Sequence, residues 1–357
     1  MDKNDKIMIL GYRGMVGSAI YRDLTKKGYT NFVLVDFPEY DLRLQDDTEM
    51  LFSREKPDYV ILAAAKVGGI VANNTYKAEF IYDNMAIALN VIESARKYNV
   101  KKLLNLGSSC IYPKFAQQPM KEEYLLTGEL EQTNEPYAVA KIAAIKLCKY
   151  YNFQYNTNFI SVMPTNLFGP NDNFNLETSH VMPGLIRKII LSKALNESNM
   201  DLVKSDIAKR RVGFGFDETI DFSDDNAVLE MLARIGITKD NVIAWGSGEV
   251  YREFLYVDDM ADACVFLMEN ADYKDIGDFV NIGTGKDLKI KELIEMIVNI
   301  AGYKGHVTFD SSKPDGTPKK LLDVTRLKRL GWEHKIQLEE GIRRVIAHYL
   351  HQFYFEK

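Results

Sequence analysis

Short apolar runs rich in β-branched residues alternate with longer segments of helical periodicity along the first half of the chain. The runs occupy residues 7–11, 32–36, 59–64, 103–107 and 159–163. Such near-continuous apolar runs are typical of strands in a parallel sheet that helices cover on both faces. Because crossovers between parallel strands are right-handed, the alternation predicts an α/β fold with a doubly wound parallel sheet.

A second region begins after the fifth of these runs. Residues 166–173 are rich in Gly, Pro and Asn, which predicts a loop that leaves the sheet. Residues 198–240 are polar, with acidic and basic clusters and one helical run at 227–236, so we expect an inserted flap there rather than a core element. Apolar runs at 254–257 and 279–283 again predict strands, through which the chain is expected to return to the first domain.

Composition narrows the class of protein. The chain has 357 residues, of which 46% are hydrophobic and 27% are charged, with a formal net charge of -5. These values exclude a disordered chain and a basic surface that coats nucleic acid. No secretory signal pattern and no apolar stretch near the ~20 residues that span a bilayer is found, so we expect a cytoplasmic protein. Cys110, Cys148 and Cys264 have no metal-like spacing and are expected as free thiols.

A glycine-rich turn follows the first predicted strand. Gly11, Gly14 and Gly17 form a GxxGxxG pattern that leads into a predicted helix. Glycines let the backbone approach a pyrophosphate closely, and the helix N-terminus at Met15 and Val16 offers free N–H groups and the positive end of the helix dipole. The turn therefore predicts a dinucleotide-binding site.

Two charged residues bear on which dinucleotide binds. Asp36 ends the second predicted strand, where an acid would bind the adenine ribose hydroxyls of NAD and repel the 2′-phosphate of NADP. Arg13 lies inside the glycine turn, from which a guanidinium could reach that 2′-phosphate. These two residues alone leave NADH and NADPH both open.

Three residues further along the chain suit the chemistry of a ketone reduction. Ser108 follows the fourth predicted strand, and Tyr137 and Lys141 form a YxxxK pair at the start of a long helix. The i, i+4 spacing places the phenol and the ammonium on one helix face. We expect the cation to lower the pKa of Tyr137, so that the phenol exchanges a proton with a substrate oxygen held by Ser108.

Short motifs are spread over nearly the whole chain. They are AAAKVGGI at 63–70, GSSCIYP at 107–113, NEPY at 134–137, MPTNLFGPNDNF at 163–174, SHV at 179–181 and WGSG at 245–248. Together they resemble the motifs of the GDP-L-fucose synthases, members of the extended short-chain dehydrogenase/reductase superfamily. The resemblance implies an enzyme that uses NADPH and is usually a homodimer paired through helices, with a Rossmann domain and a smaller C-terminal α/β substrate domain.

The resemblance also implies a division of the chain and a set of cofactor contacts. We expect residues 1–165, with about 254–285, to form the NAD(P)-binding Rossmann domain. Residues 166–253 and 286–357 are then expected to form the substrate-binding domain. Besides the glycine turn, Arg13, Asp36 and Lys141, the expected cofactor contacts are Ala63, Ala64, Pro164, Asn166, Leu167 and His180.

In this family a GDP-4-keto-6-deoxy-mannose is epimerised at C3 and C5 and then reduced at C4. The 4-keto group acidifies the protons on both neighbouring carbons, so a thiol and an imidazole on opposite sides can remove and return them through an enolate. Cys110 and His180 match the family positions that do this.

The resemblance further implies a set of substrate contacts. They are Ser109, Asn166, Lys188, Trp245, Arg252 and Asp323. Lys188 and Arg252 would neutralise the diphosphate, and Trp245 would offer a flat face to the sugar or the base.

Two departures from the family pattern keep alternatives open. Where basic residues usually follow the second strand, this chain has Asp36-Phe37-Pro38, which favours NADH. Residues 198–240 also form a longer segment than the family loop, beside the expected substrate site. A GDP-4-keto-heptose is therefore an alternative substrate, because a flap could rebuild the pocket around a longer C5 substituent.

Other functions fit the residues less well. A C4 reductase that keeps Cys110 and His180 for binding alone is the nearest alternative. A 4-epimerase or 4,6-dehydratase of the same superfamily comes next, but a dehydratase needs an acid–base carboxylate pair that Ser109 and Cys110 do not supply. A non-catalytic NAD(P) sensor would not need the intact serine, tyrosine and lysine.

Overall fold

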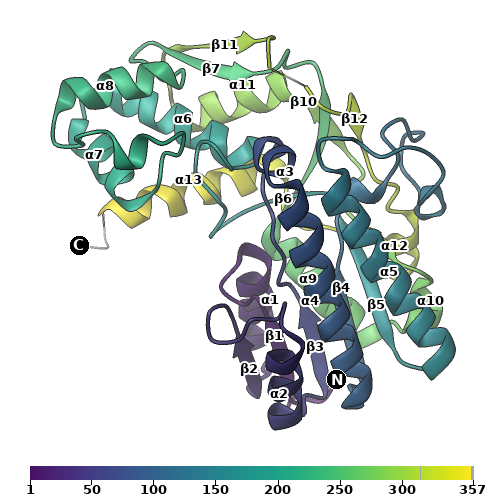
Figure 1. Cartoon of the computed structure of the whole chain (residues 1–357). Coiled ribbons are helices and arrows are strands. Elements are labelled where there is room, and N and C mark those ends of the chain that lie inside the picture. The colour runs from purple at the N-terminus through teal and green to yellow at the C-terminus, as the bar shows by residue number, and fades with distance from the viewer. Residues whose placement is uncertain (314, 355–357) are drawn as a thin grey trace.

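A computed structural model describes residues 1–313 and 315–354. Its larger sheet has six parallel strands in the order β2-β1-β3-β4-β5-β9 (Figure 1). The strands are β1 (Ile7–Leu10), β2 (Phe32–Val35), β3 (Tyr59–Leu62), β4 (Lys102–Leu106), β5 (Phe159–Pro164) and β9 (Val280–Ile282). The strand order reverses between β1 and β3, and the carboxyl ends of the strands at such a point are where open α/β sheets bind ligands.

The side chains of β1 show that helices cover both faces of this sheet. The helices are α1 (Met15–Lys26), α2 (Gln45–Glu55), α4 (Lys77–Lys97), α5 (Glu135–Tyr155) and α9 (Val257–Asn270). Ile7 and Ile9 pack in one apolar cluster with α1 and α9, whereas Met8 and Leu10 pack in another with α2, α4 and α5. Because successive strand residues point to opposite faces, the predicted doubly wound α/β fold is confirmed.

A second unit follows at the carboxyl end of the first sheet (Figure 1). Its elements are β6 (Asn166–Phe168), α6 (Val181–Asn196), β7 (Asn241–Trp245), β8 (Tyr251–Tyr256), β10 (Asp287–Lys289), α11 (Ile290–Ala301), β11 (His306–Asp310), β12 (Lys319–Lys320) and α13 (Leu338–Tyr354). Strand β8 pairs with β6, β10 and β12, while β7 pairs with β11. The strand expected at 254–257 is thus part of β8 in the second sheet, and the chain returns to the first sheet through α9 and β9.

The remaining elements are short. They are the helices α3 (Ile70–Thr75), α10 (Tyr273–Ile276) and α12 (Thr325–Arg329), and the 3-10 turns Ser109–Ile111, Glu122–Tyr124 and Phe216–Glu218. Within the described residues, no helix is both long and apolar enough to cross a membrane.

Residues 198–240 form a packed helical module rather than a polar flap. Helices α7 (Met200–Lys209) and α8 (Asp225–Arg234) bury Val203, Val228 and Leu232 against one another and against α6. Most of the charged residues that make the segment polar are exposed, whereas Asp206 of α7 is buried. Amphipathic periodicity, rather than average polarity, was therefore the informative pattern here.

A buried ion pair fixes the module to α6. The Arg187 guanidinium on α6 lies 2.8 Å from the Asp206 carboxylate on α7, and both side chains are fully buried. Arg187 Nη1 also donates to the carbonyls of Phe174 and Arg211, at 2.9 and 2.7 Å. Because a buried charge without its partner is costly, these contacts hold the module in one position.

Candidate active site

The glycine turn packs against the end of β3. Gly11 has a φ of +83°, and a Cβ there would lie 2.8 Å from the Cα of Ala64, while a Cβ on Gly17 would lie 2.2 Å from the Gly11 carbonyl oxygen. Larger residues cannot form this turn. Helix α1 begins directly after it, with Gly14 as the N-cap and no side chain capping its N-terminus. The free N–H groups of its first turn therefore fit a pyrophosphate.

Arg13 and Asp36 lie beside each other at the carboxyl ends of β1 and β2. The Arg13 side chain is exposed, and its Nε donates to the Tyr12 hydroxyl at 3.1 Å. Tyr12, and more weakly the carboxylates of Asp36 and Glu39, raise the pKa of Arg13. A cation and an anion thus both stand where the adenine ribose is expected.

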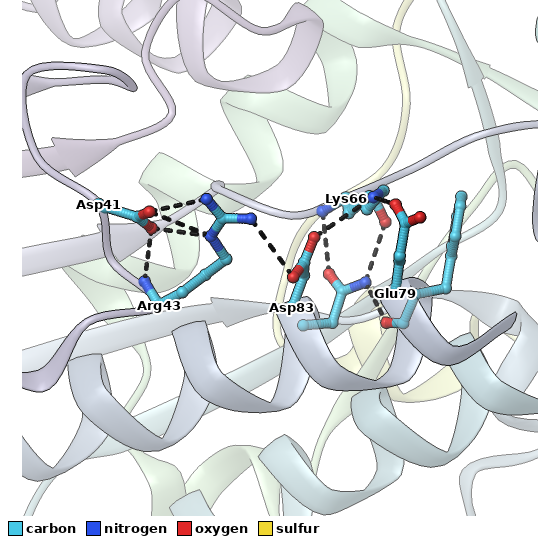
Figure 2. Close-up of polar contacts among 7 residues, drawn as sticks. Asp41, Arg43, Lys66, Glu79 and Asp83 are labelled. Atoms are coloured by element: carbon cyan, nitrogen blue, oxygen red, sulfur yellow. Dashed lines mark hydrogen bonds and ion pairs between the residues drawn. The ribbon is translucent and has the colours of Figure 1, made fainter. Parts of the chain in front are cut away.

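A chain of ion pairs borders the same end of the sheet. Figure 2 shows Asp83 of α4 between Arg43 and Lys66. Asp83 lies 3.5 Å from Arg43 Nη1 and 3.4 Å from Lys66 Nζ. Asp41 contacts Arg43 at 2.7 Å, and Glu79 pairs with Lys66. Two carboxylates, Asp41 and Asp83, thus hold the Arg43 guanidinium.

The loop after β3 is fixed at two points. Asn84 of α4 accepts a hydrogen bond from the Lys66 N–H and donates one to the Lys66 carbonyl, both at 3.0 Å. Further along, the Gly69 N–H donates to the Thr178 carbonyl at 2.9 Å. The loop that touches the glycine turn at Ala64 therefore also holds the segment that leads to His180.

The predicted serine, tyrosine and lysine come together at the carboxyl end of β4. Ser108 follows that strand, and its Oγ accepts a hydrogen bond from the Cys110 N–H at 3.4 Å. Lys141 lies in the second turn of α5, where its Nζ donates to the Leu106 carbonyl at 2.8 Å and lies 5.6 Å from the centre of the Tyr137 ring. Burial lowers the pKa of Lys141 to about 8.

The direction of the Tyr137 pKa shift differs from the sequence-based expectation. Burial, and after it the charge of Cys110, raise the pKa of Tyr137, while a hydrogen bond with Ser108 lowers it. Any lowering by the Lys141 ammonium, which lies 5.6 Å from the centre of the Tyr137 ring, is smaller than the rise that burial causes. Tyr137 is therefore protonated at neutral pH, which is the form that a proton donor needs.

Cys110 and His180 both lie near Lys320. Cys110 is buried in the 3-10 turn after Ser108, and burial raises the pKa of its thiol, whereas the charge of Lys320 and the Ser108 hydroxyl lower it. His180 is the N-cap residue of α6. The surrounding protein, and after it Lys320, lower the pKa of the His180 imidazole. The imidazole is therefore neutral at neutral pH and can accept a proton.

Lys188 and Trp245 contact each other on the far side of the site. Lys188 Nζ lies 5.8 Å from the centre of the Trp245 ring. It also donates to the carbonyls of Ile235 and Ile243, at 2.8 and 3.0 Å, and burial lowers its pKa to about 8. Lys188 thus joins the helical module to β7 as well as facing Trp245.

Arg252 and Asp323, both expected to contact the substrate, make hydrogen bonds to different segments. Arg252 Nη2 donates to the Asp315 carbonyl at 3.0 Å, and Asp315 Oδ1 accepts a hydrogen bond from the Ser247 N–H at 2.8 Å. Asp323 lies elsewhere: its carboxylate accepts from the Thr325 N–H at the start of α12. Strand β12 pairs with β8 only at Lys319–Lys320, so the chain has left Arg252 before it reaches Asp323.

The other expected contacts lie at the junction of the two sheets. Ser109 is buried in the 3-10 turn beside Cys110. Pro164 ends β5, and Asn166 and Leu167 begin β6. Asn166 Nδ2 donates to the Glu253 carbonyl on β8 at 2.8 Å, which places these residues between the first sheet and the second.

Comparisons with known proteins agree with this arrangement. A sequence model of the NAD dependent epimerase/dehydratase family matches residues 7–214 and 213–283. GDP-L-fucose synthase 1 of Arabidopsis thaliana is 48% identical over 349 residues, which cover 98% of this chain and 94% of that protein. The chain belongs to the NAD dependent epimerase/dehydratase family.

Two crystal structures from Campylobacter jejuni extend the similarity within this family. A GDP-6-OMe-4-keto-L-xylo-heptose reductase superposes with a TM-score of 0.91 at 40% identity, covering 99% of both chains. A GDP-D-glycero-L-gluco-heptose synthase, determined in the presence of NADPH, superposes with a TM-score of 0.89 at 39% identity, covering 98% of this chain and 99% of that one. The resemblance to GDP-L-fucose synthases is confirmed, and the protein is an NAD(P)H-dependent oxidoreductase.

Two residues of the candidate active site, Lys320 and Asp315, were not predicted from the sequence. Lys320 pairs in register with Arg252 across β12 and β8, and burial lowers its pKa. Asp315 connects Arg252 to the turn after Trp245. The local sign in the sequence was a polar stretch, residues 315–320, that ends in two lysines, but only the pairing of β12 with β8 brings it into the site.

Proposed function

We propose that the protein is a 3,5-epimerase/4-reductase for a GDP-linked 4-keto-6-deoxy-sugar. The supporting observation is that the Cys110 thiol and the His180 imidazole share Lys320 as a neighbour, while Cys110 also contacts Ser108. An acid–base pair suited to carbon acids thus stands inside the site of a ketone reductase. A reductase alone needs only the serine, tyrosine and lysine.

A reduced nicotinamide cofactor bound at the glycine turn would supply the hydride that C4 receives in the reduction step. The protonated Tyr137 gives its proton to the C4 oxygen, which the Ser108 hydroxyl holds by a hydrogen bond. Lys141, with a pKa of about 8, is mostly charged at neutral pH and stabilises the phenolate that remains.

In the epimerisation step, the Cys110 thiolate removes a proton from a carbon beside the ketone. The electron pair of the C–H bond moves into the ring, and negative charge develops on the C4 oxygen beside Ser108. On the opposite face the imidazolium form of His180, a minor species at neutral pH because its pKa is lowered, supplies a proton and becomes the neutral imidazole, which restores the ketone with inverted configuration. Because the protons beside C4 are acidic only while C4 is a ketone, epimerisation must precede reduction.

NADPH is the proposed cofactor, with Arg13 as the residue that binds its 2′-phosphate. We expect Arg13→Ala to weaken NADPH binding by roughly tenfold or more, as for loss of a charge-assisted hydrogen bond, and to change NADH binding little. Titration of both dinucleotides by protein fluorescence measures this. Arg43→Gln is the control, because two carboxylates already hold Arg43. Equal losses for both cofactors, or tighter NADH binding by the wild type, would contradict this assignment.

A heptose is the second candidate substrate. The observation in its favour is the helical module, which is joined to β7 and so to Trp245 through Lys188. Two measurements separate the candidates: the turnover of GDP-4-keto-6-deoxy-mannose and of a GDP-4-keto-heptose, and the stereochemistry of each product. We expect the six-carbon ketone to be reduced with inversion at C3 and C5. Turnover of the heptose alone, without inversion, would replace the proposal with a C4 reductase.

Two further proposals concern the whole molecule. Residues 1–165 with about 254–285 are proposed as the Rossmann domain and 166–253 with 286–357 as the substrate domain. Separate apolar cores in the two parts support this division. Two segments depart from it: residues 254–256 belong to β8 in the second sheet, and Leu327 and Trp332 pack in the core of the first sheet. A homodimer paired through α4 and α5 is also proposed. These neighbouring helices expose Tyr82, Leu89, Val139, Tyr150 and Phe153.

The dimer proposal predicts that Leu89→Asp shifts the protein toward a monomer, because a buried unpaired charge opposes an apolar interface. Sedimentation velocity measures the shift. Phe115, which is 81% exposed and lies outside α4 and α5, provides the control Phe115→Asp, which should leave the distribution unchanged. A wild type that sediments as a monomer would contradict the proposal.

A further inference from the structure

Phe214 of the helical module sits at the tip of a rigid loop. Gly213, Phe214 and Gly215 have φ values of +91°, +57° and +74°, a conformation that a bulky residue adopts only when its surroundings impose it. Those surroundings are two carboxylates. Asp217 accepts the Gly213 N–H at 2.9 Å, and Glu177 accepts the Phe214 N–H at 2.6 Å.

The Phe214 ring meets Trp245 edge to face. Their ring centres lie 6.3 Å apart at an interplanar angle of 68°, yet Phe214 remains 36% exposed and Trp245 43% exposed. Both residues lie on one rigid unit, because the Ile243 N–H of β7 donates to the Gly236 carbonyl of the module at 2.7 Å. An aromatic pair that is held in place and left open to solvent is typical of a ligand-binding surface.

Cationic residues continue from this aromatic pair toward the catalytic residues. Lys313 Nζ lies 5.4 Å from the centre of the Trp245 ring. In the turn after Trp245, the Ser247 N–H donates to the Asp315 carboxylate. The Asp315 carbonyl in turn accepts a hydrogen bond from Arg252. Lys320, the strand partner of Arg252, completes the path to Cys110. The site thus presents in order an aromatic surface, cations and the acid–base groups.

We propose that Phe214 and Trp245, whose rings contact each other edge to face, form an open L-shaped aromatic clamp, on which the purine base of the nucleotide sugar stacks against the exposed face of one ring and meets the other at its side. This inference rests on the proposed function, since the order of the site matches base, diphosphate and sugar along one ligand. Phe214 is then a specificity-determining residue that the helical module contributes. A purine presents a larger flat surface to the clamp than a pyrimidine, so GDP should bind more tightly than UDP.

Calorimetric titration of the full chain with GDP, UDP and inorganic pyrophosphate tests the clamp. Base–aromatic stacking predicts that Phe214→Ala weakens GDP binding by about tenfold and narrows the difference between GDP and UDP. Pyrophosphate, which has no base, should bind Phe214→Ala as it binds the wild type. Phe214→Tyr keeps the flat ring and should restore GDP affinity.

Leu229→Ala is the matched control, because Leu229 is an exposed apolar residue on α8 of the same module. It should leave all three affinities unchanged. Unchanged GDP affinity in Phe214→Ala, or an equal loss for GDP and pyrophosphate, would overturn the clamp while leaving the proposed function intact. A wild type that binds neither GDP nor pyrophosphate would overturn the proposed function itself.

Discussion

Tyr137→Phe should slow C4 reduction by ~10²–10⁴-fold, the usual contribution of a general acid, while NADPH affinity stays nearly the same. The substitution removes only the phenolic proton. It keeps the ring that packs edge to face against Phe80, with ring centres 6.2 Å apart. Consumption of NADPH with a pre-epimerised ketone measures the rate, and fluorescence titration measures cofactor affinity.

Tyr155→Phe is the control for this change, since Tyr155 is an exposed tyrosine at the far end of the same helix. It should reduce the ketone at the wild-type rate. A Tyr137→Phe enzyme that keeps more than about half of the wild-type rate would exclude Tyr137 as the proton donor.

Cys110→Ser should slow exchange of the protons beside the ketone by ~10²–10⁴-fold, because a hydroxyl is a far weaker base than a thiolate. Hydride transfer to a pre-epimerised ketone should remain largely intact, since the serine, tyrosine and lysine are unchanged. His180→Asn should impair the proton transfer on the other face. Cys148→Ala, a thiol in the core between α5 and β5, is the control and should leave exchange unchanged.

The two half-reactions should also differ in their dependence on pH. Burial raises the pKa of Cys110, so the thiolate is a minor species at neutral pH and exchange should accelerate as pH rises. Reduction needs protonated Tyr137, whose pKa is also raised. The rate of reduction should therefore not fall over the same pH range through loss of that proton. Exchange that slows as pH rises from neutral would contradict the base role of Cys110.

The parts of the site that could be predicted from sequence depend on local spacing. The glycine turn joins a strand to the next helix, and Tyr137 and Lys141 lie one turn apart on α5, so both follow from chain geometry alone. The apolar runs likewise predicted the strands of the first sheet. Cys110 and His180 were assigned through resemblance rather than geometry.

The parts that could not be predicted depend on contacts between distant segments. The contact of Asp315 with Arg252 depends on the short pairing of β12 with β8, which no local spacing in the sequence indicates. The pKa of Tyr137 depends on burial by neighbouring elements, so the expected effect of Lys141 did not hold. In the helical module, the run predicted at 227–236 corresponds to α8, but α7 and the buried contacts of the module were missed because its charged outer surface obscured its apolar positions.

The central claim is that one site performs both proton exchange and reduction. Incubation of the wild-type enzyme with GDP-4-keto-6-deoxy-mannose in D₂O, without reduced cofactor, tests it most directly by nuclear magnetic resonance. The account predicts deuterium at C3, at C5 or at both, lost in Cys110→Ser. A wild type that incorporates no deuterium and yet reduces the ketone when NADPH is added would contradict the epimerase role and leave a C4 reductase.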